Sequence, residues 1–136
     1  MTNPDLLITG ATLPDGTRAD ILVEGTRVSA VGQGLSSASA TKIDADGLIA
    51  LPGLVDLHTH LREPGYEQSE TVLTGTQAAA LGGFTSVFAM ANTLPVADTA
   101  GVVEQVLRLG DEAGYATVRP IGAVTKEIGR ASCRER

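Results

Sequence analysis

The sequence predicts an α/β fold, because three apolar strands alternate with two helical stretches after Pro52. The strand centres are expected near residues 56, 86 and 118, a spacing of about 30 residues that is typical of successive βαβ units in a parallel sheet. Residues 52–126 therefore hold two and a half β/α units, either of a (β/α)8 barrel or of an open doubly wound sheet.

The first 51 residues predict a small β unit, because short apolar runs alternate with turns that contain glycine. Strands are expected over residues 6–9, 19–23 and 27–31, followed by another strand pair over 42–45 and 48–51. So few strands leave an apolar face uncovered. We expect this unit, residues 1–51, to need a partner sheet from elsewhere in the chain.

The β/α part, residues 52–126, contains helix and strand signals in alternation. Strands are expected over 54–60, 84–90 and 115–122. One helix is expected over 69–81, with Ser69 as N-cap, and a second helix after Asp98 or Thr99. The positions expected to pack are Val72, Leu73, Ala79, Ala80 and Leu81 in the first helix, and Val102, Val103, Val106 and Leu107 in the second.

Composition and charge exclude several classes of protein. The 136 residues are 43% hydrophobic and 19% charged, with a net charge of -6, which argues against a surface for nucleic acid or an anionic membrane. No apolar stretch approaches the roughly 18 residues that a membrane-spanning helix needs. A cytoplasmic location is the expectation, and a single cysteine, Cys133, fits a reducing compartment.

The two histidines of the chain, His58 and His60, predict a metal site. Side chains alternate along a strand, so Asp56, His58 and His60 are expected on one face, where two imidazoles can meet a single metal ion. The pair comes at the carboxyl end of the first parallel strand, which is the edge where α/β architectures place their active sites. Neutral imidazole is a common ligand of zinc.

The residues around this pair resemble a known family. Pro52-Gly-Leu-Val-Asp56 and His58-Thr-His-Leu-Arg-Glu-Pro-Gly65 resemble the first-strand signature of the amidohydrolase superfamily, and within it the bacterial type I dihydroorotases. Met90-Ala-Asn-Thr93 is similar to that family's Met-Pro-Asn-Thr, with Ala91 in place of the usual proline. The resemblance runs from about Leu6 to Lys126.

The resemblance implies a (β/α)8 barrel plus a small β-sandwich that is built from both ends of a longer chain. It implies that His58 and His60 bind one zinc of a usually binuclear centre. His60, Arg62 and Asn92 are the implied substrate-binding residues, with Arg62 on the substrate carboxylate. The implied reaction is the reversible hydrolysis of dihydroorotate to N-carbamoyl-L-aspartate in pyrimidine biosynthesis. The family's general base is an aspartate of the last barrel strand, so no catalytic residue is expected within these 136 residues.

Two alternatives remain beside this interpretation. Another cyclic amidohydrolase, such as an allantoinase or hydantoinase, is disfavoured by Arg62, which would have no carboxylate to bind. A non-catalytic dihydroorotase-like subunit of aspartate transcarbamoylase is disfavoured by the intact His58 and His60. For the whole enzyme, a homodimer or an association with aspartate transcarbamoylase is the expected assembly.

The last ten residues, 127–136, differ from the rest, because five of them are charged and they show no strand or helix period. Their sequence resembles the translation of a common sequencing adaptor, so we expect a non-native tail on a truncated gene fragment. That fragment is expected to be inactive alone.

Overall fold

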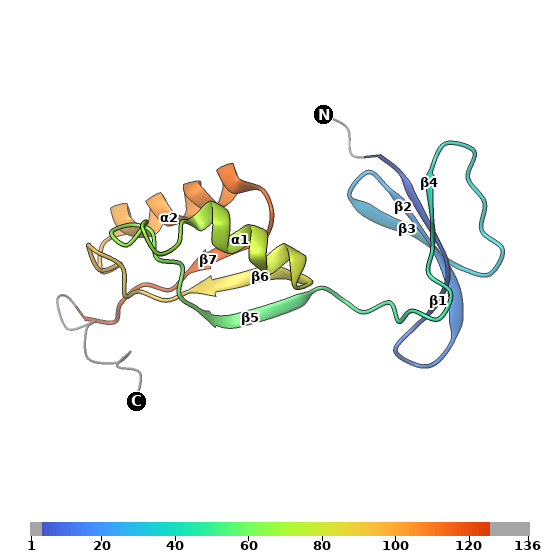
Figure 1. The fold of residues 1–136 in the computed structure, drawn as a ribbon, viewed down its shortest axis with the longest axis horizontal. Helices are drawn as coiled ribbons and strands as arrows, with labels where there is room; N and C mark the ends of the chain where they lie inside the picture. The colour runs from blue at the N-terminus through green and yellow to red at the C-terminus, as the bar shows by residue number, and fades with distance from the viewer. Residues whose placement is uncertain (1–3, 126–136) are drawn as a thin grey trace. The chain divides into compact units, whose positions relative to one another are not determined.

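The computed structural model describes residues 4–125, which divide into two compact units, one ending at Pro52 and the other beginning at Gly53. The first unit is a four-stranded mixed sheet, and the second contains parallel strands connected by helices (Figure 1). The predicted α/β class is confirmed at this level. No helix within residues 4–125 is long and apolar enough to cross a membrane.

The first unit contains four strands in the order β3-β2-β1-β4. Their bounds are β1 Leu6–Thr12, β2 Arg18–Glu24, β3 Arg27–Gly32 and β4 Thr41–Asp44. The β1–β2 and β2–β3 pairs are antiparallel, whereas β4 runs parallel to β1. Of the strand pair expected after residue 41, the first strand, over 42–45, is confirmed as β4, whereas the second, over 48–51, is wrong. Ile49 forms only an isolated bridge to Thr12. The backbone of Thr12, at the end of β1, exchanges hydrogen bonds with Leu48 and Ala50 on either side of Ile49.

The Asp20 carboxylate connects β1 and the loop after β3 through hydrogen bonds to both. Its Oδ1 accepts a hydrogen bond from the backbone N–H of Gly10 at 2.9 Å, and its Oδ2 accepts one from Leu35 at 3.1 Å. Gly10 lies where the β1–β2 ladder shifts register. The Gly10 bond is the main cause that lowers the pKa of the Asp20 carboxyl below its ordinary value of 3.8.

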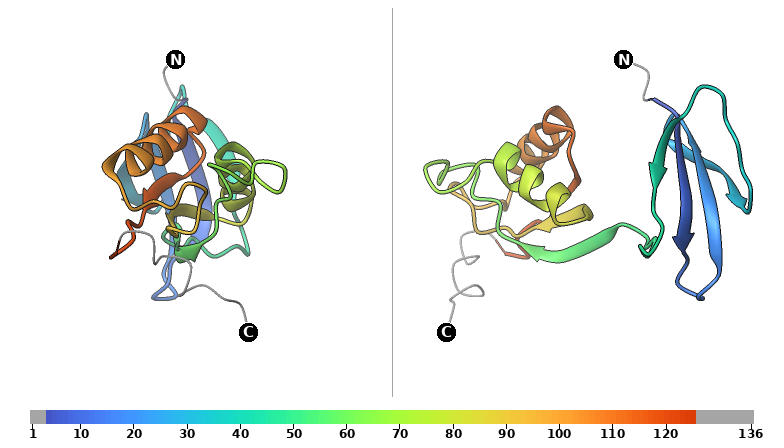
Figure 2. Two further views of the ribbon diagram at one scale, coloured as in Figure 1. Left: turned by 90° about the vertical axis from the view of Figure 1, so that its left-hand side faces the viewer. Right: turned by 45° about the vertical axis from the view of Figure 1, so that its right-hand side comes forward.

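The second unit has a parallel sheet in the order β5-β6-β7, with two helices on the same face (Figures 1 and 2). The elements in chain order are β5 Leu54–Thr59, α1 Val72–Leu81, β6 Phe84–Ala89, α2 Ala100–Ala113 and β7 Thr117–Pro120. The three predicted parallel strands are confirmed. Their carboxyl ends lie at one edge of the sheet, because parallel strands all run in the same direction.

Helix α1 begins at Val72, so the expected start at Ser69 is wrong. Thr71 is the N-cap, and its hydroxyl accepts from the backbone N–H of Thr74 in a reciprocal capping box. The Glu63 carboxylate accepts from the N–H of Val72 at 2.9 Å and satisfies another donor of the first turn. Ser69 instead belongs to a turn, since its N–H donates to the carbonyl of Tyr66.

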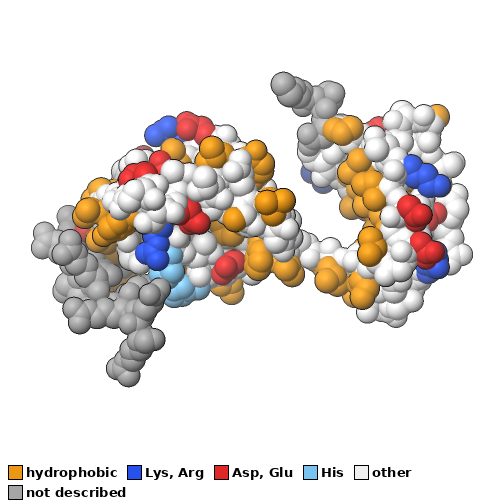
Figure 3. Space-filling view, viewed as in Figure 1, with side chains coloured by type: hydrophobic (Ala, Val, Ile, Leu, Met, Phe, Trp, Pro, Cys, Tyr) orange, Lys and Arg blue, Asp and Glu red, His pale blue; other side chains and the backbone are white. Residues whose placement is uncertain are grey.

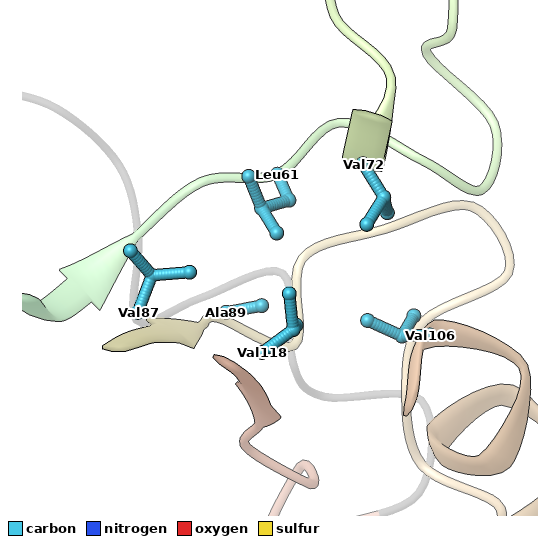
Figure 4. Close-up of a cluster of buried hydrophobic side chains, with 6 residues drawn as sticks. All are labelled: Leu61, Val72, Val87, Ala89, Val106 and Val118. Atoms are coloured by element: carbon cyan, nitrogen blue, oxygen red, sulfur yellow. The ribbon is translucent and has the colours of Figure 1, made fainter. Parts of the chain in front are cut away.

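A cluster of buried aliphatic side chains between the sheet and the helices forms the core of the second unit (Figure 4). Its members are Leu61, Val72, Val87, Ala89, Val106 and Val118. The expected burial of Val72 and Val106 is confirmed. The expected packing of Leu73 and Leu81 is wrong, because their side chains are 47% and 91% exposed.

The exposure of these leucines follows from small residues on the inner face of α1. Gly75 and Thr76 are the buried positions there, together with Val72. A Cβ atom at Gly75 would come within 2.5 Å of Leu61 Cδ2, so a larger residue would force the buried Leu61 side chain to move. Close packing of α1 on the chain after β5 thus decides which face of the helix is inside.

The loops after β5 and β6 are in direct contact. The N–H of Leu94 donates to the carbonyl of Pro64 at 2.9 Å. Gly65 has a positive φ of 101°, and a Cβ added there would lie 2.2 Å from the backbone oxygen of Leu94. Only glycine fits this approach, so the backbone of one loop fixes the position of the other.

We predict that Gly65→Ala destabilises the protein by about 2–4 kcal/mol, because it adds both left-handed strain and a collision with the Leu94 carbonyl. The matched control is Gly83→Ala. Gly83 has a positive φ of 83° but has nothing within 4 Å of an added Cβ, so its substitution should cost only about 1–2 kcal/mol. Denaturant unfolding measures both variants. Equal losses would contradict the proposed role of the loop contact.

We predict an acid-sensitive contribution from Asp20. Folding lowers the pKa of this carboxyl below 3.8, so its stabilisation is complete above that value and is lost as pH falls through the lower folded pKa. Asp20→Asn should therefore lower stability at neutral pH and flatten the acid branch of the stability curve. Circular dichroism during acid titration measures this effect. Glu24→Gln is the control, because the Glu24 side chain is exposed and makes no hydrogen bond within residues 4–125.

Candidate metal and substrate site

The carboxyl ends of β5 and β6 carry the polar side chains that the sequence predicts to be functional. His58 lies in β5, His60 directly follows that strand, and Asn92 lies in the loop after β6. The backbone N–H of Met90 donates to the carbonyl of Thr59 at 2.8 Å, which keeps the two chain segments together beyond the ladder. His60 and Asn92 therefore leave the sheet at neighbouring points of the same edge.

The two imidazole rings lie beside each other, as the sequence predicts. Their centroids are 5.1 Å apart, and the ring planes meet at 69°. His58 is exposed and His60 is half-buried. Figure 3 shows the histidine surface facing outward next to a positively charged side chain. The rings of the two histidines are thus accessible to a common ligand.

Asp56 does not share the face of the histidines, so that part of the prediction is wrong. The β5–β6 ladder shifts register between Asp56 and Thr59. Asp56 pairs with Val87 and Thr59 pairs with Ala89, and both of these β6 residues lie on the face that the helices cover. The shift breaks the strict alternation on which the prediction depended.

The Asp56 carboxylate instead supports the backbone of the strand. Its Oδ1 accepts from the backbone N–H of His58 at 2.9 Å. This bond is the main cause that lowers the pKa of Asp56 below 3.8, so the carboxylate is ionised at neutral pH. This hydrogen bond fixes the backbone at His58, the first histidine of the pair.

The ring of His60 is held by the side chain of Asn92. The two residues are 32 positions apart, and His60 Nδ1 lies 3.0 Å from Asn92 Oδ1. An amide oxygen can only accept, so Nδ1 donates in this contact, and in the neutral ring Nε2 then keeps a free lone pair. A neutral imidazole with a free Nε2 is a form that can bind zinc.

Arg62 is half-buried on the loop between β5 and α1. Its backbone carbonyl accepts from the N–H of Tyr66 at 2.9 Å, which closes a turn. Within residues 4–125, ion pairs form between Arg18 and Asp46 and between Arg108 and Glu112, whereas the Arg62 guanidinium has no carboxylate partner. No hydrogen bond joins the Arg62 side chain to the histidines or to Asn92 within these residues. Its five N–H donors are available to an external anion.

The acidic residues near the histidines do not add a third metal ligand. The Glu63 carboxylate is taken up by the backbone N–H of Val72 in the first turn of α1. No group of three His, Cys, Asp or Glu side chains within residues 4–125 is arranged to hold a metal ion. The tail 127–136 and Cys133 lie outside the described residues. The described part of the chain thus brings two imidazoles together, whereas a zinc site usually has four ligands.

The contact between His60 and Asn92 was not predicted from the sequence. The available signal was that both residues follow adjacent parallel strands, which places them at one edge. That signal does not give a side-chain contact, because the contact depends on how Gly65 and Leu94 dock the two loops.

The chain matches known proteins over most of its length. Residues 47–130 match the family model described as "Dihydro-orotase-like". The chain is 74% identical over 125 residues to a dihydroorotase of Leifsonia xyli, which covers 92% of this chain and 28% of the relative. It is 64% identical over 129 residues to a dihydroorotase of Streptomyces coelicolor, which covers 95% and 30%. The chain thus spans less than a third of these relatives.

A solved structure shares the fold at lower identity. An L-hydantoinase (dihydropyrimidinase) from Arthrobacter aurescens matches with a TM-score of 0.67 and 28% identity, covering 81% of this chain and 25% of that chain. The fold, the histidine motif and the matched residues agree, and the chain belongs to the dihydroorotase-like family.

Proposed function

We propose that this chain is the amino-terminal part of a zinc-dependent dihydroorotase, which interconverts dihydroorotate and N-carbamoyl-L-aspartate in pyrimidine biosynthesis. The observation that carries the proposal is the meeting of His58, His60 and Asn92 at one strand edge in a chain 74% identical to a dihydroorotase. The whole protein is proposed to be a (β/α)8 barrel, of which β5, β6 and β7 are the first strands. The four-stranded unit would then belong to a composite β-sandwich.

His58 and His60 are the residues of this chain that would hold zinc. The free Nε2 of His60 and the close approach of the two rings suit a shared ion. Bound zinc would polarise the ring amide of the substrate and lower the pKa of a water molecule, and two ions per subunit are proposed for the whole enzyme. The remaining ligands and the general base would come from later strands.

Arg62 and Asn92 are the proposed contacts for the substrate carboxylate, and His60 adds an imidazole beside them. The planar guanidinium of Arg62 can donate two parallel hydrogen bonds to a carboxylate. The Asn92 amide oxygen is occupied by His60, whereas its nitrogen keeps donors for an acceptor on the ligand. Both residues stand on the two loops that Gly65 and Leu94 join. A small dicarboxylate or cyclic monocarboxylate matches this set of donors.

A hydantoinase is the second candidate, because an L-hydantoinase shares the fold with a TM-score of 0.67. That similarity reaches only 28% identity, against 74% for the dihydroorotase of Leifsonia xyli. A hydantoin ring also lacks the carboxylate that would pair with Arg62. A non-catalytic subunit of aspartate transcarbamoylase remains the candidate from another class. The intact histidine pair favours an enzyme, either as a homodimer or in association with that transcarbamoylase.

The proposed activity is tested in a completed protein. Residues 1–125 of this chain are joined to the remaining part of the Leifsonia xyli relative, which is similar enough for the interface to be retained. We predict hydrolysis of dihydroorotate, loss of activity on zinc chelation, and recovery on adding zinc. Allantoin and hydantoin are compared as substrates in the same assay.

The matched control for this experiment carries His58→Ala and His60→Ala in the same completed protein. It should retain its fold and lose zinc and activity together. Preference for hydantoin or allantoin would contradict the proposed substrate. A folded, inactive protein that binds aspartate transcarbamoylase would favour the non-catalytic role.

For Arg62→Lys in the completed protein, we predict a rise of about 10- to 100-fold in KM for dihydroorotate, because lysine keeps the charge but loses the planar fork. The kcat value should change much less. Arg108→Lys is the control, since Arg108 pairs with Glu112 on the exposed face of α2, and its substitution should leave KM unchanged. Steady-state kinetics separate the two constants. An unchanged KM in the Arg62 variant would remove this residue from the proposed carboxylate site.

A further inference from the structure

We propose that Asn92 is a positioning residue for His60 as well as a substrate contact, and that it fixes the imidazole tautomer in which Nε2 is free for the metal. This inference rests on the proposed function, because it concerns the same site. The observation is the 3.0 Å contact between His60 Nδ1 and Asn92 Oδ1. A ligand that is already in the correct tautomer and orientation binds zinc without reorganising.

The Asn92 side chain acts from a well-anchored loop. The N–H of Met90 donates to Thr59, and that of Ala97 donates to Ala91, at 2.8 and 3.0 Å. The neighbouring Thr93 is buried, and its hydroxyl donates to the carbonyl of Pro95 at 2.7 Å. The loop is therefore braced on both sides of Asn92, and its amide can hold the His60 ring in one orientation.

The two histidines differ in this respect. Within residues 4–125, the His58 ring has no hydrogen-bond partner, whereas the His60 ring is bonded to Asn92. His58 is also the more exposed of the two. His60 would thus be the ligand that is already oriented without metal, and His58 would be the second ligand of the same ion.

The same amide links the metal ligand to the substrate. Its oxygen accepts from His60, and its nitrogen keeps donors for a ligand oxygen. Amide oxygen and nitrogen belong to one rigid plane, so a carboxylate held by the nitrogen has a fixed position relative to the His60 ring. Asn92 thereby sets the distance between the carboxylate site and the metal site.

Replacing Asn92 by Ala or by Asp separates the two roles. Asn92→Ala removes both the acceptor and the donors, whereas Asn92→Asp keeps an acceptor for Nδ1–H but removes the donors and adds a negative charge. We expect zinc affinity to fall by about 10- to 100-fold in the Ala variant and to be retained in the Asp variant. We expect KM for dihydroorotate to rise in both variants.

The experiment uses the completed protein. Zinc affinity is measured by competition with a chelator, and the His60 tautomer by 15N NMR of the metal-free protein, with the His60 signals assigned by their loss in His60→Gln. The Nδ1–H tautomer should dominate in wild type and in Asn92→Asp. It should mix with the Nε2–H tautomer in Asn92→Ala.

Leu94→Ala is the matched control, because it truncates an exposed side chain of the same loop and keeps its Cβ. It should leave zinc affinity and tautomer unchanged. The inference is overturned if Asn92→Ala binds zinc as tightly as wild type, if its His60 tautomer is unchanged, or if Leu94→Ala has the same effect. A protein that shows the expected zinc and NMR results but does not hydrolyse dihydroorotate would contradict the proposed function alone.

Discussion

The contact between the loops after β5 and β6 is the constraint on which the site depends. Gly65 lies so close to the Leu94 carbonyl that no side chain fits, and Leu94 in turn donates to Pro64. One of these loops presents Arg62, and the other presents Asn92. The relative position of the two residues is thus set by backbone packing, which long, flexible side chains could not achieve with the same precision.

The packing beneath these loops also fixes the position of the site residues. Leu61 enters the core immediately after His60, and α1 can lie against it because Gly75 has no side chain. Glycine weakens an isolated helix, yet here it permits the approach that anchors the end of β5. The Glu63 carboxylate holds the start of α1 from the same loop. The backbone that carries His60 and Arg62 is thereby held in place by its neighbours Leu61 and Glu63.

The sequence predicted the parallel strands and the histidine pair, because apolar periodicity and a compact motif are local signals. It failed where the outcome depended on distant partners. Leu73 and Leu81 look like core residues by type, but the small residues of α1 face the sheet. Asp56 left the histidine face because the β5–β6 ladder slips by one residue. The bond from Asn92 to His60 joins residues 32 positions apart and depends on loop docking.

We propose that this chain supplies half of a zinc site together with a carboxylate site on two joined loops. The most direct measurement is a crystal structure of the completed protein with zinc and dihydroorotate, with zinc located by anomalous scattering. We predict zinc on Nε2 of both His58 and His60, and the substrate carboxylate between the Arg62 guanidinium and the Asn92 amide nitrogen. Zinc away from the two histidines, or a carboxylate bound elsewhere, would contradict the account.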